Sequence, residues 1–366
     1  MSGLAAAPQT RRMPGLIQRL ASSRKFQSWA VRMPVLRWFV AREGAVLFDV
    51  IQGFVRSQVL MALVELDIFA AVEAGPKTAA ALAPAAGLTP ERMQVLLQAG
   101  AALGLLRRKG DGFFLSRRGA AFLGVPGLAG MVRHHAVLYR DLTDPVAFLR
   151  GETSPELARF WPYVFGAEAA ADPTVAATYS TLMSDSQTLV AEDALGLVDL
   201  KAARHLMDVG GGTGAFLRAV AVAHPGLRLT LFDLPAVLGN ARLPPQITPV
   251  PGSFRDDPLP HGADTISLVR VLYDHADPTV RALLARVHAA LPPGGRVIVA
   301  EPMGGGTRPD SATDVYFAFY CMAMGTGRTR SASEIAALLA EAGFTGIQVR
   351  PGLRPYVTSV VTANRA

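Results

Sequence analysis

The chain has 366 residues, half of them apolar, and at roughly 150 residues per domain this length predicts about two domains. The apolar content excludes an intrinsically disordered or fibrous chain. The single cysteine, Cys321, cannot form an intramolecular disulfide, so we expect a reducing compartment and a cytoplasmic protein. The net charge of +7 leaves nucleic acid and an acidic membrane surface as partners to be distinguished.

The positive charge is concentrated at the start of the chain. Residues 1–42 carry +8 and contain no acid, so the other 324 residues carry a net −1. Apolar residues recur in this arm at helical spacing, and Trp29 and Trp38 are two of the three tryptophans of the chain. This composition fits a helix lying in a membrane interface, and it fits equally an arm that packs on a partner subunit. The basic residues of the arm are Arg11, Arg12, Arg19, Arg24, Lys25, Arg32, Arg37 and Arg42.

No stretch of the sequence reaches the roughly 18 uninterrupted apolar residues that a membrane span needs. Arg11 and Arg12 resemble the start of a twin-arginine export signal, but Arg19, Arg24 and Lys25 interrupt the apolar region that should follow. We therefore expect no export signal. The expected location is the cytoplasm, with the arm as a peripheral contact to the inner face of the membrane.

The first half of the chain predicts a small helical module. Residues 45–73 are apolar on nearly all sides, as expected for a buried or subunit-interface helix. Threonine caps predict helices over 78–87 and 89–103, and two short strands flank the turn at 110–112. Helix, turn, helix and hairpin in this order are typical of a winged helix.

A winged helix reads DNA through its second helix. Here that helix offers only Arg92, Gln94 and Gln98 as base-reading side chains, among residues that suit burial. We therefore expect burial, and a winged-helix DNA-binding regulator is the alternative of a different class. His134 and His135 follow side by side in the next predicted helix. A metal pair on a helix uses spacing i, i+4, so we expect these histidines to line a pocket or the core, and we expect no metal site.

From about residue 205 short apolar strands alternate with helices, which predicts an open, largely parallel α/β sheet. The strand 205–209 leads into the glycine-rich turn 210–214 and then a helix, the arrangement of a nucleotide-cofactor site. The next strand, 227–233, ends in Asp233, suitably placed for ribose hydroxyls. The late position of the turn and the final strands RVIVAEP, IQVR and VTSVVTA favour an S-adenosylmethionine (SAM) methyltransferase over a dinucleotide-binding enzyme.

The motifs MDVGGGTGAFL, LTLFDLPAV, VRVLYDHAD, LPPGGRVIVAEP and LLAEAGF occur in that order. Together they resemble the small-molecule O-methyltransferase family, in which a winged-helix dimerisation domain precedes a Rossmann-like SAM-binding domain. The resemblance implies SAM as cofactor and a homodimer. It also implies three parts, which are a basic amphipathic arm (1–42), a helical dimerisation and substrate-pocket domain (43–175) and a SAM-binding methyltransferase domain (176–366).

Three further segments, MVRHHAVLYRDLTDPVAFLRG, LARFWPY and FYCMAMGTGRTRS, are similar to the bacterial carotenoid branch of this family, the demethylspheroidene or hydroxyneurosporene O-methyltransferases. This similarity implies methylation of the tertiary hydroxyl of a hydroxylated carotenoid during carotenoid biosynthesis. A polyketide phenol or a chlorin pigment is the alternative hydrophobic acceptor.

The resemblance also assigns cofactor residues. The glycines would form the turn around the amino-acid part of SAM, with Asp208 beside it, and Asp233 would hold the ribose. The family usually has an acid for the adenine amino group where this chain has Ser253. Arg270 resembles a basic residue near the cofactor in bacterial members. The full set is Asp208, Gly210, Gly212, Gly214, Asp233, Ser253, Phe254 and Arg270.

The catalytic position departs from the family pattern. Plant-type relatives have a histidine base after the fourth strand, a glutamate after the fifth and a further acid; here these positions are Tyr273, Glu301 and Thr329. In one interpretation His275 is the base, because an imidazole with a pKa near 6.5 is available at physiological pH. In the other, Tyr273 and His275 only orient the acceptor hydroxyl, since a phenol with a pKa near 10 is a poor resting base.

An apolar acceptor pocket is implied by several large side chains, although core packing explains many of them equally well. The substrate-pocket residues assigned are His134, His135, Met183, Met322 and Met324, with Met131, Phe148, Trp161, Tyr163, Phe165, Phe317 and Phe319 as further lining residues.

Overall fold

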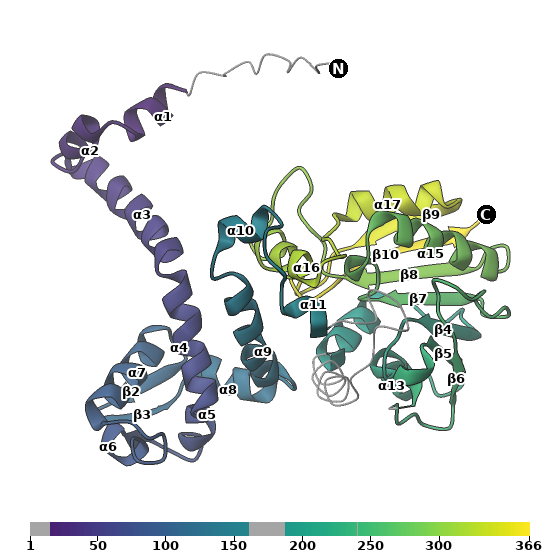
Figure 1. The fold of residues 1–366 in the computed structure, drawn as a ribbon, viewed down its shortest axis with the longest axis horizontal. Coiled ribbons are helices and arrows are strands. Elements are labelled where there is room, and N and C mark those ends of the chain that lie inside the picture. Colours follow the sequence, from purple (N-terminus) through teal and green to yellow (C-terminus); the bar gives the residue numbers. More distant parts are fainter. Residues whose placement is uncertain (1–14, 161–186, 240) are drawn as a thin grey trace.

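The computed structural model describes residues 15–160, 187–239 and 241–366. Figure 1 shows a helical N-terminal part and an α/β C-terminal part, with α9 (Leu128–Asp141) between them. The fold class expected from the sequence is confirmed.

The arm consists of α1 (Leu16–Ala21), α2 (Arg24–Ala30) and α3 (Pro34–Ile51). The Ser23 hydroxyl accepts a hydrogen bond from the backbone N–H of Phe26 and caps α2. Proline in the first turn of α3 suits a helix start, because the N–H groups of that turn have no acceptor within the helix. No residue of α1 or α3 is buried, and α3 projects from the body of the molecule in Figure 1. The apolar side chains of α3 are therefore exposed on a single copy of the chain.

The apolar segment 45–73, expected as one helix, is divided among three. After α3 ends, α4 (Gly53–Glu65) continues at 52° to it, and α5 (Ile68–Ala71) follows Asp67, whose φ of 48° lies in the left-handed region. Among the described helices, none alone has the length and apolar composition to cross a bilayer; α3 and α4 reach it only as a bent pair.

The small module folds around a three-stranded sheet of order β1-β3-β2. Its second helix, α7, buries Met93, Leu97 and Gly100 against α4. The packing is close, since a Cβ at Gly100 would lie 3.0 Å from Leu63 Cδ1. The helix–turn–helix–hairpin order is confirmed, and one face of α7 belongs to the core. The elements are β1 (Lys77–Thr78), α6 (Ala79–Leu82), α7 (Pro90–Ala102), β2 (Leu106–Lys109), β3 (Gly112–Leu115) and α8 (Arg117–Gly124).

The C-terminal part contains a seven-stranded sheet of order β6-β5-β4-β7-β8-β10-β9. The strands β6, β5, β4, β7 and β8 are parallel, and β10 runs antiparallel to both β8 and β9. The strands are β4 (His205–Val209), β5 (Arg228–Asp233), β6 (Ile247–Pro251), β7 (Thr265–Val269), β8 (Arg296–Glu301), β9 (Phe344–Arg350) and β10 (Ser359–Arg365). The helices are α13 (Ala215–Ala223), α14 (Pro235–Leu238), α15 (Asp277–Ala290) and α17 (Ala332–Glu341).

Both faces of this sheet are covered, so its strands are apolar almost throughout. Met207 and Val209 pack on the face covered by α15 and α17, whereas Leu206 packs on the face covered by α13. The chain builds β4, β5 and β6 outward and then returns to place β7 on the other side of β4. Ligands of open α/β sheets bind at such a reversal, outside the carboxyl ends of the strands. The carboxyl ends of β4 and β7 are therefore where a cofactor is expected.

A layer of helices lies between the module and the sheet. α9 contacts α16 (Ala318–Met324), which continues the π-helical turn η4 (Thr313–Phe317). Their shared apolar cluster includes Leu138, Phe148 and Met324. Two short helices, α10 (Pro145–Leu149) and α11 (Leu157–Phe160), complete the layer, and an Arg140–Glu156 ion pair of 2.9 Å fastens α9 to the segment before α11.

Candidate functional site

The glycine-rich turn after β4 forms the floor of the candidate site. Gly210, Gly212 and Gly214 have φ angles of 68°, 61° and 82°, a region that only glycine adopts at little cost. Gly211 is required for a different reason, because a Cβ there would lie 2.3 Å from Asp208 Oδ2. The turn thus exposes backbone where a side chain would block it.

Two acidic groups flank this turn. Asp208 is the last residue but one of β4 and accepts a 2.6 Å hydrogen bond from Ser267 Oγ at Oδ1, while its buried Oδ2 has no partner among the described residues. Asp233 ends β5 and accepts the N–H groups of Gly212 and Leu234, each at 2.7 Å. Burial raises the pKa of Asp208 to about 7, with a further contribution from Asp233, and it raises the pKa of Asp233 to about 6. A nearby positive charge favours the ionised form of such carboxyl groups, so a cationic ligand would offset the effect of burial.

The turn after β7 gathers the predicted catalytic residues. The 3₁₀ turn η3 (Leu272–Asp274) buries Tyr273, whose backbone N–H donates to Glu301 Oε2 at 3.2 Å. Burial raises the pKa of Glu301 to about 7, against the opposing charge of Arg330, and burial raises the pKa of Tyr273 well above its ordinary value. Glu301 therefore fixes the backbone of the turn, and Tyr273 remains a neutral phenol at physiological pH.

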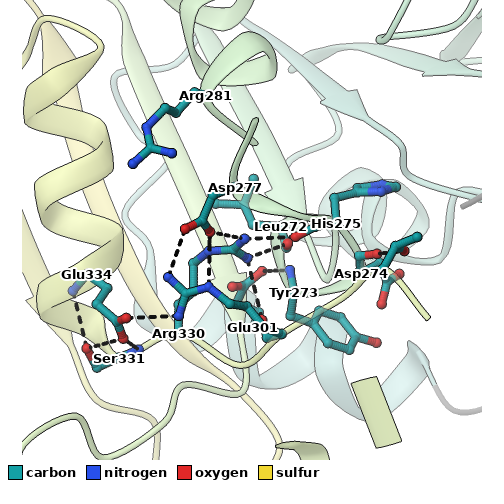
Figure 2. A network of polar contacts seen from close by, with 12 residues as sticks. Leu272, Tyr273, Asp274, His275, Asp277, Arg281, Glu301, Arg330, Ser331 and Glu334 are labelled. Carbon is teal, nitrogen blue, oxygen red and sulfur yellow. Dashed lines mark hydrogen bonds and ion pairs between the residues drawn. The ribbon is translucent and has the colours of Figure 1, made fainter. Parts of the chain in front are cut away.

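Arg330 also holds the turn at residues 272–275, through contacts drawn in Figure 2. Its fully buried guanidinium donates to the carbonyl of Leu272 at 2.7 Å and to that of His275 at 2.8 Å, and it pairs with Asp277 Oδ1 at 2.6 Å. Sequence reasoning missed Arg330, because it directly precedes the capping box of α17 and carries no spacing signal of its own.

His275 points away from the Tyr273 ring (Figure 2). Its Nδ1 lies 3.0 Å from Arg255 Nη2, so it accepts from the guanidinium, and its ring meets Phe254 edge-on at 5.2 Å. Burial, together with the charges of Arg255 and Arg330, lowers the pKa of His275 to about 3. Its imidazole is therefore a weak base whose Nδ1 is already occupied.

Arg270 stands at the carboxyl end of β7. Its φ of 55° is unusual for a residue with a side chain, and such backbone strain is typical of functional sites. The guanidinium donates to the carbonyl of Val357 at 3.0 Å and lies 5.7 Å from the centre of the Phe317 ring. Arg270 thus connects the carboxyl end of β7, where the strand order reverses, to the helical layer.

The predicted pocket histidines pair with tyrosines across the helical layer. His134 Nε2 lies 3.0 Å from the Tyr320 hydroxyl, and His135 Nε2 lies 2.6 Å from the Tyr316 hydroxyl. Burial lowers the pKa of His135 to about 4, so both partners are neutral at physiological pH. Tyr316 and Tyr320 were not predicted, although their spacing of four residues places them on one helix face.

The other predicted pocket residues differ in position. Met324 is buried in the same layer, whereas Met322 is 46% exposed. The rings of Phe148 and Phe319 stack with their centroids 6.2 Å apart, and the centroids of the Phe317 and Tyr273 rings lie 6.4 Å apart. Met183, Trp161, Tyr163 and Phe165 lie outside the described residues.

Two family models match this chain. One describes an O-methyltransferase domain and matches residues 139–345; the other describes an O-methyltransferase dimerisation domain and matches residues 48–124. The chain belongs to the O-methyltransferase family. The match to the dimerisation domain supports the homodimer expected from the sequence.

Curated relatives of this O-methyltransferase include two bacterial enzymes. The chain is 64% identical to demethylspheroidene O-methyltransferase of Cereibacter sphaeroides, covering 95% of this chain and 94% of that protein. It is 55% identical to the enzyme of the same name from Rhodobacter capsulatus, with 98% and 92% covered. Mouse acetylserotonin O-methyltransferase is 32% identical, with 86% and 87% covered.

Solved structures agree with this assignment. Human N-acetylserotonin methyltransferase in complex with SAM superposes with a TM-score of 0.73 at 25% identity, covering 88% of this chain and 98% of that one. The mitomycin 7-O-methyltransferase structure gives a TM-score of 0.73 at 26% identity, with 89% and 98% covered. The chain is therefore a SAM-dependent O-methyltransferase, as expected from its sequence.

The residues of this O-methyltransferase fit SAM. The unpartnered Oδ2 of Asp208 and the open glycine turn suit the ammonium group of the amino-acid part, and Asp233 at the end of the next strand suits the ribose hydroxyls. Phe254 offers an aromatic face beside His275 for the adenine. Ser253 occupies the position where the family has an acid. Its hydroxyl donates to Asp256 at 2.8 Å and its backbone N–H donates to Asp257 at 2.7 Å, so two acids lie three and four residues after that position. When bound, SAM supplies an electrophilic methyl group on a sulfonium.

This arrangement changes the catalytic expectation. In the structure His275 contacts Phe254 and accepts a hydrogen bond from Arg255. These contacts do not support the role of general base predicted for it. Tyr273 and Glu301 do lie together, with Glu301 bonded to the Tyr273 backbone. One contribution of the enzyme's own residues is to hold the acceptor oxygen in line with the methyl group, an effect that supplies about 7–11 kcal/mol in favourable cases.

Proposed function

We propose that this O-methyltransferase methylates the tertiary hydroxyl of a hydroxylated carotenoid of the demethylspheroidene type. The observation that carries the proposal is the 64% identity over 95% of the chain to a demethylspheroidene O-methyltransferase. The apolar helical layer on the acceptor side, with Phe148, Phe319 and Met324, suits a long polyene. The neutral His–Tyr pairs add few charges to that surface.

The test is a transfer assay with defined acceptors. The protein is incubated with methyl-labelled SAM and detergent-dispersed demethylspheroidene, and the product is examined by mass spectrometry for a methyl ether. A carotenoid lacking the hydroxyl is the negative control, and a naphthol and a chlorin acid are competing acceptors. The expected result is label in the hydroxylated carotenoid alone. Label in the naphthol or chlorin and none in the carotenoid would assign another hydrophobic acceptor.

We further propose that the arm contacts an anionic membrane surface on the cytoplasmic side, where such an acceptor resides. Trp29 and Trp38 are 50% and 56% exposed, and all six described basic residues between 15 and 42 are exposed. Basic residues near an anionic leaflet contribute about 1 kcal/mol each, and exposed tryptophans suit the interface. The alternative occupant of this surface is the partner subunit.

Sedimentation with vesicles separates the two occupants. The whole chain should sediment with phosphatidylglycerol vesicles and not with phosphatidylcholine vesicles, and a chain of residues 43–366 should sediment with neither while remaining a dimer. A matched variant, Trp29→Ala with Trp38→Ala, should keep the charge and weaken binding at high salt. If residues 43–366 are monomeric, the arm is an assembly element and the membrane proposal is wrong.

A further inference from the structure

Asp274 is a buried carboxyl group with an unused acceptor atom. It is 5% exposed, and its buried Oδ1 has no hydrogen-bond partner among the described residues. Buried polar atoms without partners are rare in native structures, and an ionised carboxylate oxygen can only accept. A donor brought by a ligand would complete this site.

Charged and titratable groups surround this carboxyl from several elements. Glu301 of β8 disfavours its ionised form, whereas Arg270 at the end of β7 favours it. The buried thiol of Cys321 on α16 and the Tyr273 side chain are further titratable groups near it. Burial raises the pKa of Asp274 well above the ordinary value, followed by the effect of Glu301. Once ionised, the group is thus a stronger base than an exposed aspartate, and the charge of Arg270 opposes the rise in its pKa.

The side chain faces the acceptor layer. In Figure 2 the Asp274 carboxyl and the Tyr273 ring lie on the side of the turn opposite to Ser331 and Glu334. On that side the Tyr273 ring packs against Phe317, which lies between Tyr316 of η4 and Tyr320 of α16. The carboxyl therefore lies on the side of the turn that meets the helical layer.

We propose that Asp274 is the general base of this O-methyltransferase, acting where the family's histidine is replaced by tyrosine. Its Oδ1 accepts the hydroxyl of the acceptor and receives the proton as the oxygen is methylated. The O–H bond breaks and an Oδ1–H bond forms; an electron pair of the acceptor oxygen forms the bond to the methyl carbon, and the electrons of the broken carbon–sulfur bond stay on sulfur. The sulfonium and carboxylate charges cancel, and Asp274 later loses the proton to water.

The neighbouring groups are less suited to this step. Glu301 uses Oε2 to hold the Tyr273 N–H and faces Arg330 behind the turn. His275 accepts from Arg255 and points elsewhere. The Tyr273 phenol stays protonated, because burial raises its pKa well above the ordinary value.

The test compares Asp274→Asn with the unmodified enzyme. Asparagine keeps the shape and cannot take a proton, so kcat should fall by about 10²–10⁴-fold, with the SAM dissociation constant changed less than threefold by calorimetry. The unmodified enzyme should show a rising limb in its pH–rate profile, and this limb should be absent from the variant. Asp274→Glu should recover part of kcat. The control, Asp111→Asn, removes an exposed aspartate from the β2–β3 turn and should match the unmodified enzyme.

The proposal rests on methyl transfer to oxygen and not on the carotenoid assignment, so kcat is measured with whichever acceptor the unmodified enzyme methylates. Failure of the carotenoid alone would overturn the proposed acceptor and leave this comparison intact. If Asp274→Asn is poorly folded, Asp274→Ala is assayed with added formate, which should restore activity in a concentration-dependent way. A kcat within threefold of the unmodified value, an unchanged pH profile, or no formate rescue would each show that Asp274 is not the base.

Discussion

Replacing Arg330 by methionine removes the cation that holds the turn at residues 272–275. Arg330 is fully buried, so its loss leaves the carbonyls of Leu272 and His275 without donors and Asp277 without one of its two arginines. Removing one partner of a buried pair costs about 3–5 kcal/mol. Asp277 is 30% exposed and keeps its ion pair with Arg328. We therefore expect the free energy of unfolding to fall by the lower end of this range, about 3 kcal/mol.

A loss of that size lowers the midpoint of thermal unfolding by about 6–12 °C, at 2–4 °C per kcal/mol for a domain of this size. The assay is thermal unfolding followed by circular dichroism without SAM. Arg281→Met is the matched control, because its pair with Glu341 is about half exposed on both sides and contributes about 0–1 kcal/mol. If Arg330→Met melts within 2 °C of the unmodified protein, the turn is held by something other than this guanidinium and the reasoning fails.

Three further outcomes are expected. His275→Ala should change kcat less than threefold between pH 6 and 8 and should weaken SAM binding, because the imidazole packs on Phe254 and already accepts from Arg255; a tenfold fall in kcat with normal SAM affinity would restore it as the base. Gly211→Ala should abolish SAM binding in calorimetry, since its Cβ would meet Asp208 Oδ2 at 2.3 Å, and unchanged affinity would show that the turn can move. Because the folded-state pKa of Asp208 is raised to about 7, its contribution favours folding at low pH and is lost as pH rises from about 4 to 7. Urea unfolding of the SAM-free Asp208→Asn variant should therefore show a stability gain over the unmodified protein that grows from pH 5 to pH 8, by about 1.4 kcal/mol per unit of pKa difference, and a pH-independent difference would contradict the burial argument.

The parts of the site that the sequence predicted are those encoded locally. Gly210 to Gly214 and Asp233 follow directly from strand, turn and helix spacing, because the carboxyl ends of adjacent parallel strands meet at one edge. The largely parallel sheet and the N-terminal cap of α7 follow from similarly short signals.

The misjudged parts depend on residues that meet only in the folded chain. In the sequence His275 has the properties of a base, because its partner Arg255 lies 20 residues earlier, in the loop after β6, and the contact forms only in the folded chain. The tyrosines that pair with His134 and His135 lie more than 180 residues away. No proline marks the break between α3 and α4, so the apolar composition alone predicted one continuous helix there.

The last strand also has a consequence for synthesis. β10 lies between β8 and β9, and the carbonyl of Val357 just before it receives the guanidinium of Arg270. Domains fold from the N-terminus during translation, so the dimerisation module can fold, and meet a partner, before β10 has been made. The sheet is complete only after β10 has been made and has entered between β8 and β9. Each newly made subunit is therefore able to pair before it is able to methylate.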